Sequence, residues 1–280
     1  MSRGLTLRDA RDYNIIGCVE PQKSGKTEGW HDAAFFNMCR PLELVFSNGM
    51  DKGVRIGPAT GNVEDMTTFE QFYDAYKKQM DYAIQLLVNA DNAIDMAHAE
   101  RCPLPFLSSM VDDCMKVGKT VQEGGAVYNF TGPQGFGVAN MADSLYSVKT
   151  LVYDEKKITM GELKEALATN YGKGLGAEDV AAMTAKIANE LKEAGKTIGE
   201  KEVAAILNTV VAASEAPEVK ANGERILKLI EEVPKFGNDI PEVDAFARDV
   251  AYTYTEPLQN YKNPRGGSFQ AGVYSGSAKV

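Results

Sequence analysis

The sequence predicts an α/β fold in which parallel strands alternate with helices. The first observation is a βα unit, in which residues 126–130 favour a strand, 131–137 a glycine-rich turn and 138–152 a helix. A strand, a glycine turn and a helix in succession are typical of folds with parallel sheets. The second observation is a pair of further strand candidates, at 13–19 and at 268–274.

The composition indicates a globular protein and argues against several function classes. The chain has 280 residues and a net charge of −9, so nucleic acid is not the expected partner, because phosphate backbones require clustered Lys and Arg. The apolar runs are shorter than the ~20 residues that span a bilayer, and no apolar signal segment opens the sequence, so we expect a cytoplasmic protein. Four cysteines without CxxC or His–Cys clusters indicate reduced thiols and no zinc site. They are Cys18, Cys39, Cys102 and Cys114.

The first elements of the chain are expected to be a strand and a helix. Residues 13–19 favour a short buried strand, and Gly17 within it allows close backbone approach. A helix is expected over residues 30–47, with Asn48-Gly49 ending it. Pro41 lies inside that span and would kink or split the helix.

The clearest element is a long amphipathic helix from Phe69 to Glu100. Thr68 and Gln71 form a capping-box pattern at its start. Apolar residues recur at helical spacing along one face, which is expected to be core. This face comprises Phe69, Phe72, Tyr73, Tyr76, Met80, Ile84, Leu87 and Val88. A short helix is expected to follow at 108–117.

The composition changes over residues 172–230, where Ala, Glu and Lys dominate. We interpret this segment as a helical insertion in the α/β scaffold, and its charges fit a solvated surface. The candidate helices within it are 177–194, 199–213 and 217–230. Further helices are expected on either side, ending near residue 170 and running from 241 to about 261.

Cys18 and Glu20 are the main candidates for chemistry. In an extended stretch they point to the same side of the backbone, and Pro21 favours an extended Glu20. The neighbouring carboxylate would raise the thiol pKa, which disfavours a thiolate nucleophile and fits a neutral thiol that transfers a hydrogen atom. Glu20 would then take the proton. The alternative is that Cys18 is simply a small buried apolar residue.

Two further groups are open to more than one interpretation. His31 and Asp32, at the start of the expected helix, could hydrogen-bond substrate hydroxyls, or could be a core histidine and a helix cap. His31 could also serve Cys18 as a base, which the acidic neighbourhood disfavours. The turn at 132–137 could hold a phosphate or be a tight βα turn, and it lacks the Lys-Ser/Thr of a P-loop.

Several motifs resemble the glycyl radical enzymes of the pyruvate formate-lyase superfamily, in the branch of glycerol and propanediol dehydratases and choline trimethylamine-lyase. The similarity covers nearly the whole chain outside the insertion. The motifs are Gly17-Cys18-Val19-Glu20-Pro21-Gln22, Gly29-Trp30-His31-Asp32, Ala99-Glu100-Arg101, Pro103-Leu104-Pro105, Tyr128-Asn129-Phe130, Lys235-Phe236-Gly237-Asn238-Asp239 and Asn263-Pro264-Arg265-Gly266-Gly267. The resemblance implies that residues 1–280 form part of a ten-stranded α/β barrel, interrupted by the helical segment 172–230.

The resemblance also implies roles for individual residues. Cys18 matches the thiyl-radical cysteine and Glu20 the general base that deprotonates a substrate hydroxyl. Asp32 matches a carboxylate that binds hydroxyl groups, accompanied by His31, and Tyr274 matches a pocket-lining tyrosine. The implied reaction is the radical dehydration of a small diol such as glycerol or propane-1,2-diol.

The alternatives are other members of the family and a chain without catalysis. Val19 stands where pyruvate formate-lyase has a second cysteine, which disfavours a formate acetyltransferase. His31 and Phe35 replace the Thr and Tyr expected of choline C–N lyases. A C–S lyase acting on a sulfonate would want an Arg near Tyr274, and residues 275–277 offer none. A non-catalytic fragment or subunit remains the further alternative.

The family's cofactor and partners follow from the resemblance. No bound cofactor and no metal are expected, because the family uses a glycyl radical installed by an S-adenosylmethionine/iron–sulfur activating enzyme. The Arg-Val-x-Gly-Tyr motif of that glycine does not occur in this sequence. The chain is therefore expected to be a partial one, working with the remaining part of the enzyme, with its activating enzyme and as a homodimer when full length.

Overall fold

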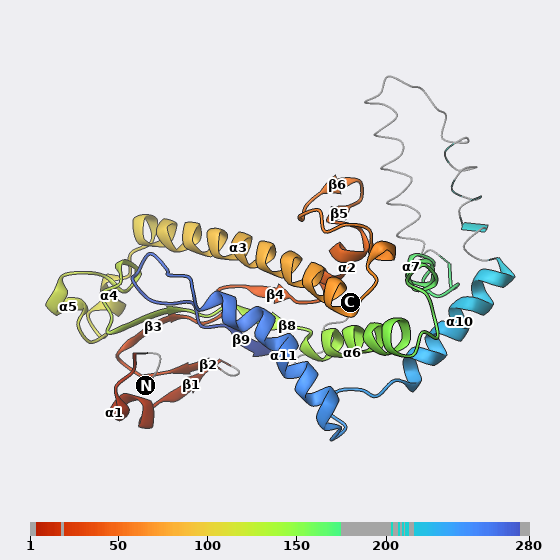
Figure 1. The fold of residues 1–280 in the computed structure, drawn as a ribbon. Helices are drawn as coiled ribbons and strands as arrows, with labels where there is room; N and C mark the ends of the chain where they lie inside the picture. The colour runs from red at the N-terminus through yellow and green to blue at the C-terminus, as the bar shows by residue number, and fades with distance from the viewer. Residues whose placement is uncertain are drawn as a thin grey trace. The chain divides into compact units, whose positions relative to one another are not determined.

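The computed structural model describes residues 4–17, 20–174 and 216–274, together with positions 203, 207, 209, 211 and 212. The chain divides into two compact units, one formed by residues 1–145 and 235–280 and the other by residues 146–234. Figure 1 shows the elements of both units. Cys18, Val19 and the helices expected at 177–194 and 199–213 lie mainly or wholly outside the described residues.

Parallel strands form the centre of the first unit, as the sequence predicts. Strand β3 (Thr27–Trp30) pairs in parallel with β7 (Tyr128–Thr131). Strand β8 (Gln134–Phe136) lies between β4 (Phe35–Asn37) and β9 (Gly272–Tyr274), parallel to both (Figure 1). The segment β3–β4 therefore lies beside the segment β7–β8 and runs parallel to it, and a short turn separates the two strands of each segment.

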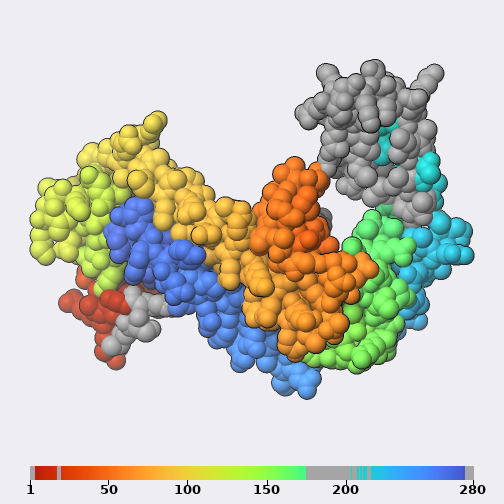
Figure 2. All heavy atoms as spheres, turned by 45° about the horizontal axis from the view of Figure 1, so that its top comes forward, coloured from red at the N-terminus to blue at the C-terminus, as the bar shows by residue number. Residues whose placement is uncertain are grey.

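Two long helices pack together beside these strands. Helix α3 (Phe69–Arg101) contacts α11 (Pro241–Leu258), and the space-filling view shows the gold and blue surfaces side by side (Figure 2). The Tyr254 ring of α11 stacks on Phe36, with ring centroids 4.9 Å apart, and lies over Gly135. His98 of α3 makes an edge contact with Trp30. One face of the strands is therefore covered by helices.

Helix α3 confirms the most local of the predictions. Thr68 accepts a hydrogen bond from the backbone of Gln71, and the Gln71 side chain accepts one from the backbone of Thr68, which completes the capping box. The apolar stripe is buried, since its fully or nearly fully covered members are Phe72, Tyr76, Met80, Ile84 and Val88.

The helix expected from Trp30 is wrong in its first half. Trp30 ends β3, residues 35–37 form β4, and only Arg40–Phe46 is helical, as α2. Strand pairing with β8 keeps residues 35–37 extended. Pro41 lies in the first turn of α2, where a missing N–H costs nothing, so it begins the helix instead of kinking it.

Two other expectations are also corrected. Asn14–Ile16 is a strand, β1, but its residues are exposed, and it pairs with β2 (Glu20–Gln22) in an antiparallel hairpin. The glycine-rich turn expected at 131–137 contains strand β8, which pairs with β4 and β9. Gly135 in this strand lets the Tyr254 ring approach the backbone, since a Cβ there would lie 2.7 Å from that ring.

Short elements complete the first unit. The single helix expected at 108–117 is replaced by two one-turn helices, α4 (Pro105–Ser108) and α5 (Cys114–Val117). The other short elements are α1 (Leu7–Arg11), β5 (Met50–Asp51), β6 (Val54–Arg55) and the 3₁₀ turns Val63–Asp65 and Val121–Glu123.

The second unit is helical over its described residues. Helix α6 (Val138–Val148) passes from the first unit into the π-helical turn Lys149–Asp154. Helices α7 (Met160–Ala168) and α10 (Pro217–Glu232) pack together, and Arg225 pairs with Glu162 at 2.7 Å. The helices predicted after the βα turn, before residue 170 and at 217–230 are confirmed, as is the one from 241, which ends at Leu258.

Candidate active site

Glu20 is a buried carboxyl group at the start of β2. Only 5% of its surface is exposed. Residues 17–19 connect β1 to β2, so Glu20 directly follows the connection that contains Cys18. Gly17 has φ +61°, and a Cβ there would lie 2.6 Å from Glu20 Oε2. The glycine therefore provides both the left-handed backbone and the space that this carboxyl group occupies.

Asp32 joins Glu20 from the turn between β3 and β4. The two side chains are hydrogen-bonded to each other, and burial raises the pKa of Asp32, as do the charge of Glu20 and this hydrogen bond. Two carboxyl groups in contact cannot both ionise freely, so the pair favours one shared proton. Asp32 is not a helix cap, since no helix begins there.

His31 lies next to this carboxyl pair as a neutral imidazole. Burial lowers its pKa, while the charge of Glu20 acts in the opposite direction. Its ring lies over Gly29 and meets the edge of Phe130 with centroids 4.9 Å apart. Nε2 is buried and has no hydrogen-bond partner among the described residues. A ring nitrogen of this kind is available to a substrate hydroxyl.

Gln134 connects these groups, and the sequence analysis did not single it out. Its Nε2 donates to Glu20 Oε1 at 3.3 Å and to the main-chain oxygen of His31 at 3.0 Å. Its side chain is buried. The only hint in the sequence was its place between Gly132 and Gly135, where small neighbours allow close packing.

Tyr274 lies on the same face of the sheet, further along the strands. It is in register with Phe136, and the two rings are 4.9 Å apart. Phe136 is two residues beyond Gln134, so both side chains point to one face. Phe35 also contacts Phe136 and is 71% exposed. The structure therefore groups Glu20, His31 and Asp32, and places Tyr274 at an aromatic row beside them.

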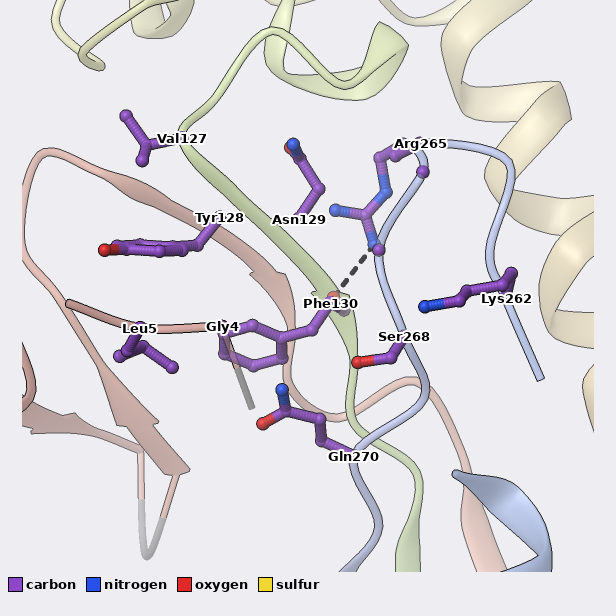
Figure 3. Close-up of a pocket in the computed structure, with 12 residues that line it drawn as sticks. Gly4, Leu5, Val127, Tyr128, Asn129, Phe130, Lys262, Arg265, Ser268 and Gln270 are labelled. Carbon is purple, nitrogen blue, oxygen red and sulfur yellow. Dashed lines mark hydrogen bonds between the residues drawn. The ribbon is translucent and has the colours of Figure 1, made fainter. Parts of the chain in front are cut away.

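Arg265 lies in a motif that the sequence analysis named, but no role was predicted for it. Its guanidinium forms a buried ion pair with Asp95 at 2.9 Å and donates to the main-chain oxygens of Glu28 and Phe130. Figure 3 shows the bond to Phe130. Phe130, Gln270 and Lys262 help to line the surrounding pocket, whose volume is about 300 Å³. Phe130 thus lies between this pocket and His31.

The described residues contain no group of three or more His, Cys, Asp or Glu side chains placed to hold a metal ion. Across the same part of the chain, no helix has the length and apolar character needed to cross a bilayer.

Comparison with known proteins identifies the family. The family model described as pyruvate formate lyase-like matches residues 1–280. This chain belongs to the pyruvate formate lyase-like family. The resemblance noted in the sequence is thereby confirmed, and so is the α/β fold class, since the structure matches glycyl radical enzymes of this family.

Three members of this family illustrate the similarity. A structure described as 1,2-propanediol dehydration in Roseburia inulinivorans is 59% identical with a TM-score of 0.91, over 98% of this chain and 33% of that one. The glycerol-bound B12-independent glycerol dehydratase of Clostridium butyricum is 49% identical with a TM-score of 0.78, over 98% and 28%. The (2S)-3-sulfopropanediol dehydratase of Klebsiella oxytoca is 32% identical over 100% of this chain and 28% of its own length. The chain therefore spans about a third or less of these relatives.

Proposed function

We propose that this chain carries the thiyl-radical cysteine loop of a glycyl radical dehydratase that acts on a small diol such as glycerol or propane-1,2-diol. The observation that carries the proposal is the contact between Glu20 and Asp32, with the unpartnered His31 nitrogen beside them. Glu20 follows Cys18 by two residues. The names of the two similar structures, glycerol dehydratase and 1,2-propanediol dehydration, support a diol substrate.

The proposed residues divide the reaction between hydrogen-atom and proton transfer. The sulfur radical of Cys18 takes a hydrogen atom from a hydroxyl-bearing carbon and becomes a thiol. Glu20 takes the proton of that hydroxyl group, the neighbouring C–O bond breaks, and the departing hydroxide leaves as water with one proton from the site. The product radical recovers a hydrogen atom from the Cys18 thiol, so a diol becomes an aldehyde and water.

Asp32 and His31 have binding roles in this proposal. Asp32 and neutral His31 each offer a hydrogen-bonding group, so together they fit the two hydroxyl groups of a diol. Tyr274 extends the same face with an aromatic surface. These groups orient the substrate so that one carbon faces the thiol and one hydroxyl faces Glu20.

The proposal includes partners outside this chain. A glycyl radical in the rest of the enzyme supplies the unpaired electron. We infer that an S-adenosylmethionine/iron–sulfur activating enzyme installs it, and that the whole enzyme is a cytoplasmic homodimer.

The decisive experiment compares two cysteine variants in the active enzyme that contains this chain. Cys18→Ser should abolish turnover of propane-1,2-diol to propionaldehyde while the glycyl radical signal in electron paramagnetic resonance persists. Cys102→Ser is the matched control, because Cys102 is an exposed free cysteine, and it should retain turnover. Turnover by Cys18→Ser would refute the proposal.

A further inference from the structure

Gln134 is the one described side chain that donates both to Glu20 and to the turn carrying His31 and Asp32. Its Nε2 is 3.3 Å from Glu20 Oε1 and 3.0 Å from the main-chain oxygen of His31, and only 3% of its surface is exposed. The amide therefore links the β1–β2 hairpin to the β3–β4 turn across strand β8.

The orientation of this amide is determined by its neighbours. The main-chain oxygen of His31 can only accept a hydrogen bond, so the nitrogen of Gln134 must face it. The same nitrogen then faces Glu20 Oε1. That carboxyl oxygen therefore accepts a hydrogen bond from the amide.

Two glycines leave room for this arrangement, because they have no side chain. A Cβ at Gly272 would lie 2.0 Å from the oxygen of Gln134, and a Cβ at Gly17 would lie 2.6 Å from Glu20 Oε2. Glycine at these two positions lets the amide and the carboxyl group lie close to the neighbouring backbone. The pair is therefore held in position by packing as well as by its hydrogen bond.

We propose that Gln134 is a positioning residue that holds the Glu20 carboxylate by Oε1 and favours its ionised form. The inference rests on the proposed function for the substrate's role, but the effect of Gln134 on Glu20 does not depend on turnover. A donor to the ionised carboxyl group stabilises it against protonation. Gln134 thereby keeps Glu20 available as a base.

The charged and titratable groups around Glu20 set the background for a test. Among the described residues, Asp32 and His31 act on Glu20 from the β3–β4 turn. Gln134 acts from β8 as a neutral donor, and Cys18 lies two residues before Glu20 in sequence. Replacing Gln134 leaves these titratable groups in place, so a change in the titration of Glu20 reports on the amide.

The test uses Gln134→Met, which keeps the length and removes the donor, in the active enzyme. The acid limb of the kcat/KM profile should move to higher pH by about one unit, the size expected when a carboxylate loses one hydrogen-bond donor. Gln134→Glu keeps a polar group and replaces the donor with a second carboxyl group, so it should move the limb further.

Gln79→Met is the matched control. Gln79 is also a buried glutamine over a glycine, donates to a main-chain oxygen (that of Pro58 at 2.8 Å) and has an unpartnered Oε1, but it makes no contact with Glu20 in the described hydrogen bonds. Its replacement should leave the acid limb unchanged. Equal displacement in Gln79→Met, or no displacement in either Gln134 variant, would overturn the inference.

A second measurement separates this inference from the proposed function. Carboxyl ¹³C shifts of the glutamate-labelled protein, with Glu20 assigned through Glu20→Gln, give the titration midpoint of Glu20 without any turnover. The midpoint should rise in Gln134→Met and stay constant in Gln79→Met. Identical midpoints in wild type and Gln134→Met would exclude the inference even if the dehydratase assignment holds.

Discussion

Asp91 of helix α3 is a carboxyl group that the fold buries without a complete set of partners. Its Oδ2 atom has no hydrogen-bond partner among the described residues, and 2% of the residue is exposed. Burial, and secondarily the charge of Asp95, raises the pKa of Asp91 to about 6. Asp95 forms an ion pair with Arg265, so it remains charged, repels an ionised Asp91 and donates no hydrogen bond to it.

Asp91→Asn should therefore stabilise the protein above pH 7. A folded-state pKa above the unfolded value means that the stability contributed by the neutral carboxyl is present below about pH 4 and lost as pH rises through 6. The asparagine variant does not ionise, so it should be more stable by about 2–3 kcal/mol at pH 8 and converge with wild type near pH 4. Urea unfolding at several pH values measures this difference.

The matched control is Asp74→Asn, an exposed aspartate in the same helix. Its unfolding free energy should differ little from wild type at any pH in this range. An Asp91→Asn curve that runs parallel to the wild-type curve from pH 4 to pH 8 would contradict the role given to Asp91.

At the scale of elements, local information decided which predictions succeeded. Helix α3 was predictable because its capping box and apolar period lie within one segment. Strand β4 was not, because its three residues become extended by pairing with β8, about a hundred positions away. The neighbouring turn at His31 and Asp32 was misplaced for the same reason, and the roles of both residues remain predictions.

The candidate site was predictable only in part for a similar reason. Glu20, His31 and Asp32 could be found in two short motifs. Gln134 could not, because its partners lie 114 and 103 positions away in sequence. No spacing rule connects a glutamine in a glycine-rich turn to a carboxylate at that separation, so only the folded sheet shows the contact.

The Arg265–Asp95 pair ties helix α3 to strands β3 and β7. Side-chain exposures of 2% and 7% show that both charges are buried. Asp95→Asn should destabilise the protein by about 3–5 kcal/mol, since it leaves the buried guanidinium without its counter-ion. Chemical unfolding monitored by circular dichroism measures the change.

A double variant distinguishes the ion pair from simple loss of packing. Arg265→Met with Asp95→Leu removes both charges, so it should lose less stability than the sum of the single changes. Strict additivity of the two single variants would show that the pair is not coupled. Arg40→Met is the control, because its partners Glu43 and Asp51 are exposed and such pairs contribute about 0–1 kcal/mol.

At the scale of the whole molecule, the parallel strands of the first unit carry the supporting helices on one side and the candidate site on the other. Trp30 and Gly135 face helices α3 and α11, while His31, Gln134 and Tyr274 occupy the other face or its turn. The alternation of strand side chains produces this division. Substitutions on the helix side should therefore affect stability first, and those on the site side should affect turnover first.

In the second unit, the two segments that flank the predicted insertion lie against each other. A Cβ on Gly223 would lie 2.3 Å from the backbone of Tyr171, and one on Gly172 would lie 2.4 Å from the Cα of Lys220. Residues 171–172, just after α7, thus lie against the first turns of α10. We propose that this contact, together with the Arg225–Glu162 pair, holds the ends of the predicted insertion independently of the residues between them.

Replacing residues 175–214 with six Gly and Ser residues should therefore preserve the α7–α10 pair. Shortening the loop lowers its closure cost by about 2 kcal/mol, which offsets part of the apolar burial lost with Val203 and Leu207. We expect one cooperative thermal transition with a midpoint within about 5 °C of the parent. Gly223→Leu, which forces a side chain into the Tyr171 backbone, should instead lower the midpoint in both the parent and the shortened protein. If the shortened protein unfolds without cooperativity, residues 175–214 are needed to hold α7 and α10 together.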